Sequence, residues 1–564
     1  MKGRIFSIVT VFVIFTVFFP SYITAQTAPV VMSYYVKAGG NDANNGLSES
    51  RPFRTLAKAI SSASVSNIKT ITVIGRLNSK SENSDYSGDA LFNINIRSAA
   101  QITIRGKPNS LPEERAILDA QKSGYRVLRI SGSANIRLEN IDITGGNSYA
   151  SGGGIYIDGN TVLTIGRGTR IYKNRTNYSG GAISAGGGRI MMEDGYIYGN
   201  RCGDGGGGVH TYEGQEFIMS GGMIYNNTAN WGGGVNNMGT FILRNGAISE
   251  NRAIKGSGGV CVEKGVFTME NGVIGGNKCG LGNGGGGINI YENGHFRMRG
   301  GRITENEAGW GGGIYIEGQT DITGGFISGN TAVYGGGGIY VHSMAKLFMT
   351  GGQITNNEAE TGGGLRVDGH SSIENTQITG NNADIHGGAV FTLRGSYLEM
   401  KNVVVNRNQS NQSGGGISTS GEFEIRNSSI SDNQAIWGGG IYSEGLTGIW
   451  NSLIKGNRSF WGGGLAVNVS ETEINNSEVS ENYAFTGGGG LNINNGEAYF
   501  VNSTISGNKS QNGGGIYIHS GNVSIRGGSV SNNMADKGPF VYRRKFGGLD
   551  NFLTGLSNDI YTEE

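Results

Sequence analysis

The sequence is poor in proline and in charge, and each scarcity excludes a class of protein. Only six of the 564 residues are proline, and Pro539 is the single proline from Glu113 to the end of the sequence. Because proline removes a backbone donor, this spacing is expected where nearly every strand is central in a sheet. Charged residues make up 16% of the chain, below the usual quarter, and the net charge is +1. These values do not indicate a partner that is nucleic acid or an acidic membrane surface.

Cysteine is too scarce for a disulfide framework or a metal site. Cys202 and Cys279 occupy the same place in two sequence repeats that lie three repeats apart, and Cys261 falls inside a predicted strand. Stacking of the repeats would separate the first two by about 14 Å, whereas a disulfide needs Cα atoms within about 7 Å. The spacing is not that of zinc ligands, and the histidines are scattered as well. We therefore expect free thiols, no metal and no cofactor.

Long apolar runs are absent except at the amino terminus. Lys2 and Arg4 precede an apolar run at residues 5–19, and a polar stretch ends at Thr24, Ala25 and Gln26. This pattern predicts a secretory signal peptide over residues 1–25. No second apolar segment follows, so no transmembrane segment is expected in the mature chain. The sequence predicts an exported protein, either extracellular or at the cell surface, and leaves outer-membrane association open.

Glycine, by contrast, is abundant and periodic. The chain contains 104 glycines, many of them in runs such as GGGIYI at residues 152–157. The first apolar residue after each run, which we call the register mark, recurs every 24 to 28 residues. The fifteen register marks are Ile155, Ile183, Val209, Val235, Val260, Ile288, Ile314, Ile339, Leu365, Val390, Ile417, Ile441, Leu465, Leu491 and Ile516. Such a repeat predicts one structural unit stacked on itself.

Each repeat contains three short segments with the composition of strands. In the first repeat they are residues 155–157, 162–165 and 170–172, separated by glycine, asparagine or aspartate. Strands that recur at this period without hairpin signals are expected to pair in parallel with their copies about 4.8 Å away. The prediction is an all-β solenoid with three strands per coil, and fifteen coils would extend about 70 Å.

A second mark lies between the third strand and the next glycine run. It is an asparagine, and the fifteen copies are Asn174, Asn200, Asn227, Asn251, Asn277, Asn306, Asn330, Asn357, Asn381, Asn408, Asn433, Asn457, Asn482, Asn508 and Asn533. Asparagine tolerates the left-handed backbone of a sharp corner, and stacked amides can bond to each other. An internal corner ladder is therefore favoured over a row of ligand-binding residues.

The paired marks resemble the GGA[I/L/V] and FxxN repeats of the polymorphic outer membrane proteins. They are also similar to other bacterial β-helix proteins of the pectin-lyase-like class. Residues 180–183 and 387–390 match the first motif literally, and the resemblance covers about residues 150–535. It implies a right-handed, three-sided parallel β-helix. Isoleucine or valine replaces the phenylalanine of the second motif, and no translocator barrel is expected after the repeats.

The resemblance and the repeats divide the chain into four parts. After the signal peptide, residues 26–150 form an amino-terminal cap, residues 151–537 the regular repeats and residues 538–564 a carboxy-terminal cap. Within the first cap, residues 51–60 have apolar side chains at helical spacing and predict a helix that covers the open end of the solenoid. Asn41, Asp42 and Asn44 precede it, but no acidic residue completes a calcium loop.

Candidate functional residues come from the strand positions expected to face outward, one and three places after each register mark. Coils seven to ten present, in order, Tyr315 and Glu317, Tyr340 and His342, Arg366 and Asp368, and Phe391. Acidic side chains and a histidine beside aromatic residues can bind a sugar or perform acid–base chemistry. An exposed strand face with mixed polar residues is the alternative. The regular repeats are expected to leave little material for a walled cleft.

Four tryptophans immediately precede glycine runs and therefore share one edge of the solenoid. They are Trp231, Trp310, Trp437 and Trp461, of which the last two lie in consecutive coils and could stack. Aromatic rows on a surface edge suit contact with carbohydrate or protein. The alternative is that the rings pack over bare glycine backbone.

Three functions remain open from the sequence. The first is a secreted or cell-surface adhesive scaffold that binds a polysaccharide or a host or cell-surface protein through a lateral face. The second is a polysaccharide lyase or glycosidase with Glu317, His342, Asp368 and Arg366 as its catalytic candidates. The third is a structural envelope protein. The catalytic patterns of pectin-lyase-like enzymes, such as an adjacent aspartate pair, are missing, which favours the first.

Overall fold

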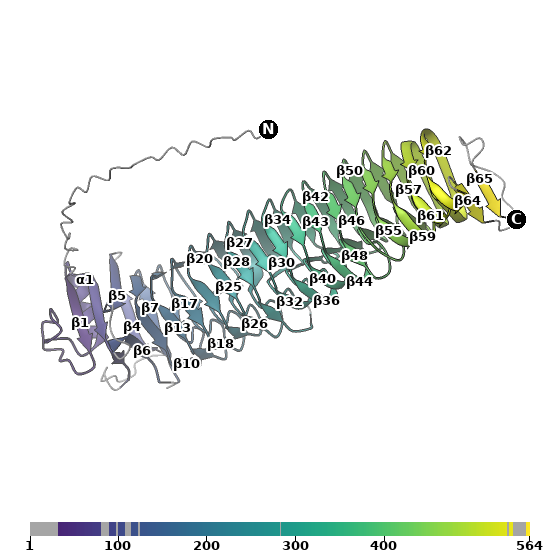
Figure 1. Ribbon diagram of the computed structural model, residues 1–564. Coiled ribbons are helices and arrows are strands. Elements are labelled where there is room, and N and C mark those ends of the chain that lie inside the picture. Colours follow the sequence, from purple (N-terminus) through teal and green to yellow (C-terminus); the bar gives the residue numbers. More distant parts are fainter. Residues whose placement is uncertain are drawn as a thin grey trace, which may run out of the picture. The chain divides into compact units, whose positions relative to one another are not determined.

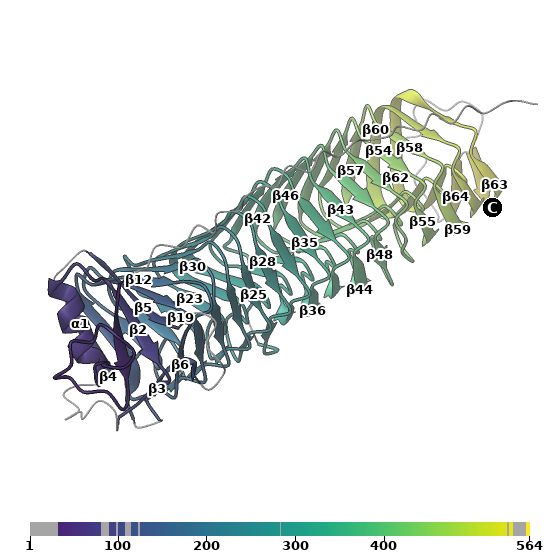
Figure 2. The same ribbon diagram turned by 60° about the vertical axis from the view of Figure 1, so that its left-hand side comes forward.

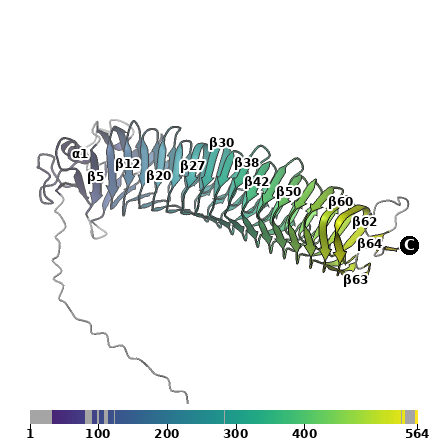
Figure 3. The ribbon, with the colours of Figure 1, turned by 90° about the horizontal axis from the view of Figure 1, so that it is seen from above.

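The computed structural model describes residues 32–79, 90–96, 100–107, 114–121, 124–282, 284–538, 541–544 and 560–563. The predicted signal peptide and most of the predicted carboxy-terminal cap lie outside these residues. From Ser33 onward the described chain is one unit of stacked coils. The coils follow one another in sequence order along one axis (Figures 1 and 3).

Each regular coil contributes to three parallel ladders, in most coils with three separate strands and in a few with a long strand that continues from one ladder into the next, such as β27 (Val260–Met269) and β60 (Leu491–Ser506). The first coil consists of β11 (Ile155–Ile157), β12 (Val162–Ile165) and β13 (Arg170–Tyr172). These pair in parallel with β15 (Ile183–Ala185), β16 (Arg189–Met192) and β17 (Tyr196–Tyr198) of the next coil. The three strands per coil and the parallel solenoid are confirmed.

A fourth, shorter strand follows the asparagine corner and was not predicted. In the first coil it is β14 (Arg175–Thr176), which pairs with β18 (Arg201–Cys202). Eleven such strands form a second sheet from β10 (Asn147–Ser148) to β48 (Gln409–Ser410), and four more continue from β55 (Arg458–Trp461) to β63 (Met534–Lys537). These strands run along one side of the solenoid (Figure 1), and a glycine run follows them in the sequence of the regular coils.

The predicted register is confirmed along the whole stack. Ile155 pairs with Ile183, which pairs with Val209, and the ladder continues through every register mark to Ile516. The marks are fully buried, and one hydrophobic core runs through the centre of the coils. A one-residue slip would turn this apolar row outward, which is why the core fixes the register.

The asparagines form an internal ladder of hydrogen bonds. In a typical link the Asn200 Nδ2 atom donates to Asn227 Oδ1 at 3.0 Å and to the carbonyl oxygen of Ile171 at 2.9 Å. All fifteen asparagines are joined in this way and at most 5% exposed. Because every amide is satisfied, this row is structural.

One detail of the corner prediction is wrong. The left-handed residue is the one before the ladder asparagine, as at Lys173 (φ 55°) and Asn226 (φ 53°), and none of the ladder asparagines has a positive φ in the described residues. The asparagine is required for its amide and not for its backbone, because the backbone N–H of Asn200 also donates to Asn227 Oδ1. At the glycine runs, the backbones of neighbouring coils do approach closely, as the sequence predicts. A Cβ at Gly154 would lie 2.7 Å from the carbonyl oxygen of Ala182.

A helix lies against the first coils, as expected for a cap (Figure 2). It is α1 (Leu56–Val65), which begins five residues later than the predicted helix because the side chain of Thr55 caps it by accepting from the N–H of Lys58. Its apolar side packs on β1 (Ser33–Lys37), β2 (Thr70–Ile74) and β4 (Ala90–Ile96). The Asp42 carboxylate accepts from the backbone N–H of Arg54 and of Thr55, so it fixes the start of the helix. No helix within the described residues is long and apolar enough to cross a membrane.

Candidate functional site

The candidate residues lie in a strip that we call the lateral groove. Its floor consists of the side chains one place after each register mark, and one wall is the fourth ladder with the residues just before the glycine runs. In coils seven to ten the floor is built by β33 (Ile314–Ile316), β37 (Ile339–Val341), β41 (Leu365–Val367) and β45 (Val390–Thr392). Register places Tyr315, Tyr340, Arg366 and Phe391 in one row, as the sequence predicts.

The row is not an open face, which corrects the expectation from the sequence. Tyr315, Tyr340 and Phe391 are only 3%, 7% and 8% exposed, although none belongs to the hydrophobic core. Beside them the fourth ladder has strands longer than those of the first coils, namely β32 (Glu307–Trp310), β36 (Thr331–Gly335), β40 (Glu358–Thr361) and β44 (Asn382–His386). The expectation of little material for a walled cleft did not allow for this ladder, which provides one wall.

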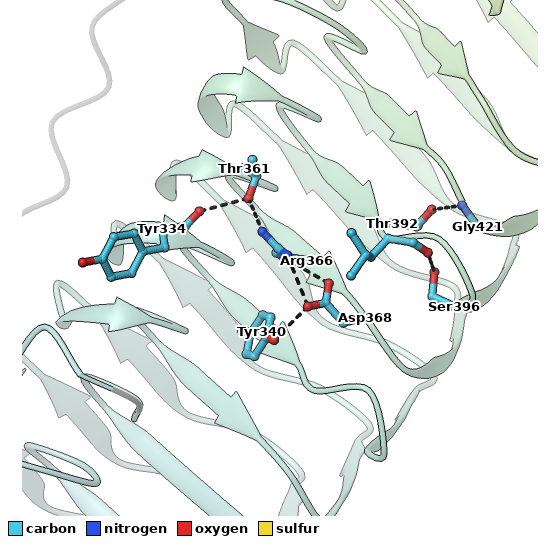
Figure 4. Close-up of polar contacts among 9 residues, drawn as sticks. Tyr334, Tyr340, Thr361, Arg366, Asp368, Thr392, Ser396 and Gly421 are labelled. Atoms are coloured by element: carbon cyan, nitrogen blue, oxygen red, sulfur yellow. Dashed lines mark hydrogen bonds and ion pairs between the residues drawn. The ribbon is translucent and has the colours of Figure 1, made fainter. Parts of the chain in front are cut away.

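Arg366 is the centre of a closed hydrogen-bond network in this part of the groove (Figure 4). Its Nε and Nη2 atoms donate to Asp368 Oδ1 and Oδ2 at 3.0 and 3.2 Å, and its Nη1 atom donates to Thr361 Oγ1 at 2.9 Å. The hydroxyl of Tyr340 donates to Asp368 Oδ2 at 2.8 Å. Both carboxylate oxygens of Asp368 are thus occupied by protein donors.

Aromatic rings surround the same guanidinium group. Its carbon lies 4.9 Å from the ring centre of Trp310, 5.2 Å from that of Phe391 and 5.8 Å from that of Tyr340. The side chains of Arg366 and Asp368 are 14% and 8% exposed. We call Arg366, Asp368 and the three aromatic residues Trp310, Tyr340 and Phe391 the Arg366 cluster. It is an ion pair buried among aromatic rings, and a ligand would have to displace one of its members to reach Asp368.

Glu317 and His342 lie beside this cluster and are half-buried. The hydroxyl of Tyr315 donates to Glu317 Oε1 at 3.2 Å. Burial raises the pKa of Glu317, and the hydrogen bond from Tyr315 and the nearby His342 partly offset this rise. Burial also raises the pKa of Tyr315 and Tyr340. A carboxyl group with a raised pKa is suited to donate a proton. Among the predicted catalytic residues, Glu317 is therefore the one whose environment suits a general acid.

The four tryptophans line the edge of the groove and pack in two ways. Trp437 and Trp461 are stacked, with ring centres 5.6 Å apart, as predicted. Trp231, Trp310 and Trp461 each lie over a glycine of the following coil; a Cβ there would come within 2.8, 3.2 and 2.9 Å of the ring. Those glycines are Gly256, Gly335 and Gly487. The alternative in which rings cover bare glycine backbone therefore describes three of the four.

A pocket of about 480 Å³ opens in the same groove at coils three to six. It is lined by Ser179, Asp204, His210, Tyr212, Trp231, Asn236, Met238, Glu263, Lys264 and Tyr291. Only Trp231 was singled out from the sequence. His210 and Asn236 occupy the position of Tyr340 and Arg366, and Glu263 occupies that of Asp368. The same offset from the register mark, applied to coils three to five, would have identified all three.

Metal and thiol chemistry are not supported by the described residues. Within them, no group of three or more His, Cys, Asp and Glu side chains could hold a metal ion. The three cysteines are free, as expected. Burial raises the pKa of Cys202 to about 12 and that of Cys279 to about 11, so both thiols are protonated at neutral pH.

The comparison with known families agrees with this geometry. The family described as "Right handed beta helix region" matches residues 286–458, which span coils six to twelve. The chain is a right-handed parallel β-helix protein. It has no match among the curated proteins or the solved structures.

Proposed function

We propose that this protein is an exported scaffold, extracellular or at the cell surface, that binds a glycan or a protein through its lateral groove. The observation that carries the proposal is the contrast between the repeated interior and the varied groove. Core residues and ladder asparagines recur in every coil, whereas the groove floor changes from His210 and Asn236 to Tyr340 and Arg366. Stacking alone requires no such variation on the outside of the coils.

The composition of the groove supports recognition. Tryptophan, tyrosine and arginine are the residues that dominate binding surfaces, because they combine apolar area with polar groups. Here Trp231, Trp310, Trp437 and Trp461 follow one edge while Tyr340 and Arg366 lie on the floor. The predicted signal peptide at residues 1–25 and the resemblance to polymorphic outer membrane protein repeats support an external location.

The test compares the groove with another face of the same coils. The protein without residues 1–25 is applied to a panel of glycans and to intact cells, together with two variants. Trp437→Ala with Trp461→Ala changes the groove, and Tyr198→Ser changes the stacked tyrosines of β17, which lie on another ladder. We expect the first variant to lose binding and the second to retain it. Equal binding by all three proteins, or no binding by any, would contradict the proposal and favour a structural envelope role.

A polysaccharide-cleaving enzyme is the second candidate, because burial raises the pKa of Glu317 beside His342. In that case Glu317→Gln should reduce the release of reducing or unsaturated ends from a cleaved polysaccharide by at least about 100-fold. Glu358→Gln, which changes an exposed carboxyl group on β40, serves as the matched control. Failure of the unaltered protein to release ends from any polysaccharide would remove this candidate.

A further inference from the structure

The pocket around Trp231, which we call the Trp231 pocket, contains a short chain of buried polar groups. The Asn236 Nδ2 atom donates to Glu263 Oε1 at 2.9 Å and lies 3.2 Å from His210 Nδ1. Since an amide nitrogen can only donate, His210 Nδ1 accepts, and the proton of the neutral imidazole is on Nε2. Burial lowers the pKa of His210 to about 4, so the ring is neutral at neutral pH.

Two polar atoms of these hydrogen-bonded side chains make no hydrogen bond themselves to the residues that the structure describes. His210 Nε2 and Asn236 Oδ1 are buried and have no hydrogen-bond partner within the described part of the chain. Both residues are 2% exposed. One atom is a donor and the other an acceptor, and both residues line the pocket. Buried polar groups are nearly always paired, so a pocket with an unpaired donor and an unpaired acceptor is suited to a ligand that supplies both.

The rest of the pocket supplies carboxylates and aromatic rings. Asp204 accepts a hydrogen bond only from Ser179 among the side chains of the described residues, at 2.7 Å, and retains further acceptor capacity. The ring of Trp231 meets the edge of Tyr291 with centres 5.8 Å apart. The ring of Tyr212 lies edge-on to His210 at 4.4 Å. A volume of about 480 Å³ falls in the range of about 300–1,000 Å³ typical of small-ligand sites.

A glycine lies against Asn236 at the edge of the pocket. A Cβ at Gly205 would lie 2.2 Å from Asn236 Nδ2. Gly205 pairs with Trp231 at the edge of the groove, in the place that Trp310 and Thr361 occupy in coils seven and nine. A side chain at Gly205 would therefore collide with Asn236, as one at Gly335, the equivalent glycine beside Arg366, would collide with Arg366.

We propose that the Trp231 pocket binds one neutral sugar unit of a glycan. Sugar hydroxyl groups can donate to Asp204, Glu263 and Asn236 Oδ1 and accept from His210 Nε2, while an apolar sugar face packs on an aromatic ring. The proposal rests on the groove binding proposed above and adds the class of ligand.

Charge decides which ligands are excluded. An acidic sugar would bring its carboxylate close to Asp204 and Glu263, which repel it. A cationic ligand would meet Lys264 in the lining, and Lys255 Nζ already lies 5.8 Å from the ring centre of Trp231. A neutral ligand with many hydroxyl groups avoids both penalties.

The test measures binding of defined hexasaccharides by calorimetry. The neutral probes are hexasaccharides of β-1,4-linked glucose, mannose and N-acetylglucosamine, and the acidic probe is hexagalacturonate. We expect at least one neutral probe to bind, and Trp231→Ala to weaken that binding at least about tenfold. Trp450→Ala is the matched control, since Trp450 lies on β53 (Thr447–Trp450) in another ladder, against Arg426, and it should leave the affinity within about twofold.

A second variant avoids any loss of the tryptophan. Gly205→Ala places a methyl group against Asn236 and removes no side chain from the pocket. It should also reduce the affinity for the neutral probe at least about tenfold. Neutralising the pocket with Asp204→Asn and Glu263→Gln should raise the affinity for hexagalacturonate at least about tenfold.

The outcomes separate this proposal from the proposed function. If no neutral probe binds, or if Trp231→Ala and Trp450→Ala weaken binding equally, the sugar pocket is wrong. If hexagalacturonate binds the unaltered protein as tightly as a neutral probe, the charge argument is wrong as well. Binding to cells that persists in Trp231→Ala and is lost in the Trp437→Ala, Trp461→Ala variant would retain the groove as a binding surface without the sugar pocket.

Discussion

The Arg366 cluster and the Trp231 pocket occupy equivalent positions of the same groove and differ in what their polar groups contact. In the cluster, the guanidinium of Arg366 and both oxygens of Asp368 bond to neighbouring side chains. In the pocket, His210 and Asn236 bond to each other and still have one polar atom each without a partner in the described residues. The polar groups of the cluster are satisfied by neighbouring side chains, whereas those of the pocket would need a ligand to satisfy them.

The difference comes from the edge residues and not from the fold. Beside Arg366 the successive edge residues are Trp310, Gly335 and Thr361, whereas beside Asn236 they are Ser179, Gly205 and Trp231, so a serine stands where the cluster has the ring of Trp310. The backbone ladders are the same in both regions. A β-helix of this kind thus provides the same strip of positions in successive coils, and the choice of side chain at each coil decides whether that strip is filled or forms a pocket.

The largest effect is expected from breaking the Arg366 cluster. Arg366→Ala removes the partner of a carboxylate that is 8% exposed, so the Asp368 charge is left buried. We expect the free energy of unfolding to fall by about 4 kcal/mol, as for other broken buried ion pairs. Urea unfolding measures it, with the exposed Arg297→Ala as the control. A loss below about 1 kcal/mol would show that the cluster is not the closed network described here.

The Trp231 pocket should be recognisable by its pH dependence. The folded pKa of His210, about 4, lies below its ordinary value of 6.5, so between these values the unfolded chain binds the proton and the folded chain does not. The free energy of unfolding should therefore fall as the pH drops from 6.5 to 4, by about 3 kcal/mol from this residue alone. The difference between the unaltered protein and His210→Gln, followed over this range, isolates the effect; a constant difference would contradict the buried neutral state.

A smaller effect is expected from removing one aromatic face of the cluster. Trp310→Leu retains apolar volume but removes the ring that lies 4.9 Å from the guanidinium carbon. The cation–π contribution predicts a loss of about 1 kcal/mol in the free energy of unfolding. In the double variant with Arg366→Ala the two losses should not add, because the second change removes the interaction that the first one weakens. Simple additivity would show that Trp310 acts only by packing.

The last variant tests whether an unpartnered buried polar atom outside the pocket affects stability alone. Ser184 lies one coil before His210 in the same row, and its buried Oγ atom also has no partner in the described residues, but it does not line the pocket. Ser184→Ala should therefore raise the free energy of unfolding by about 1 kcal/mol and leave ligand affinity unchanged. Thermal unfolding and the hexasaccharide titration measure the two values. A change in affinity would mean that the pocket extends further than its lining indicates.

The repeated features were predictable from the sequence because each one is set by a single residue type. A buried aliphatic residue fixes each register mark, and an asparagine amide fixes each ladder link, as at Ile155 and Asn200. The stack of Trp437 on Trp461 followed from the same spacing. The wall of the groove did not, because β36 and β40 look like connecting segments until their neighbours pair with them.

The chemistry of the groove was only partly predictable. The spacing predicted that Arg366 lies near Asp368 and in one row with Tyr340. The contacts of Trp310 and Thr361 with Arg366 could not be predicted, because they depend on how side chains from three coils pack together. His210 and Asn236 have the same offset from the register mark as Tyr340 and Arg366, but the sequence does not distinguish them from other polar residues at that offset. Their importance comes from the atoms they leave unpaired, which only the three-dimensional arrangement shows.

The asparagine ladder has a direction, and this has a consequence for how the protein can change in length. Each amide donates toward the following coil, from Asn174 to Asn200 and onward to Asn533. A chain with one coil fewer, or one coil more, would break no link within the row and would leave a single end at the last coil. Duplication or deletion of one 24- to 28-residue coil therefore shifts the distance between two parts of the groove in steps of about 4.8 Å while each part keeps its own side chains.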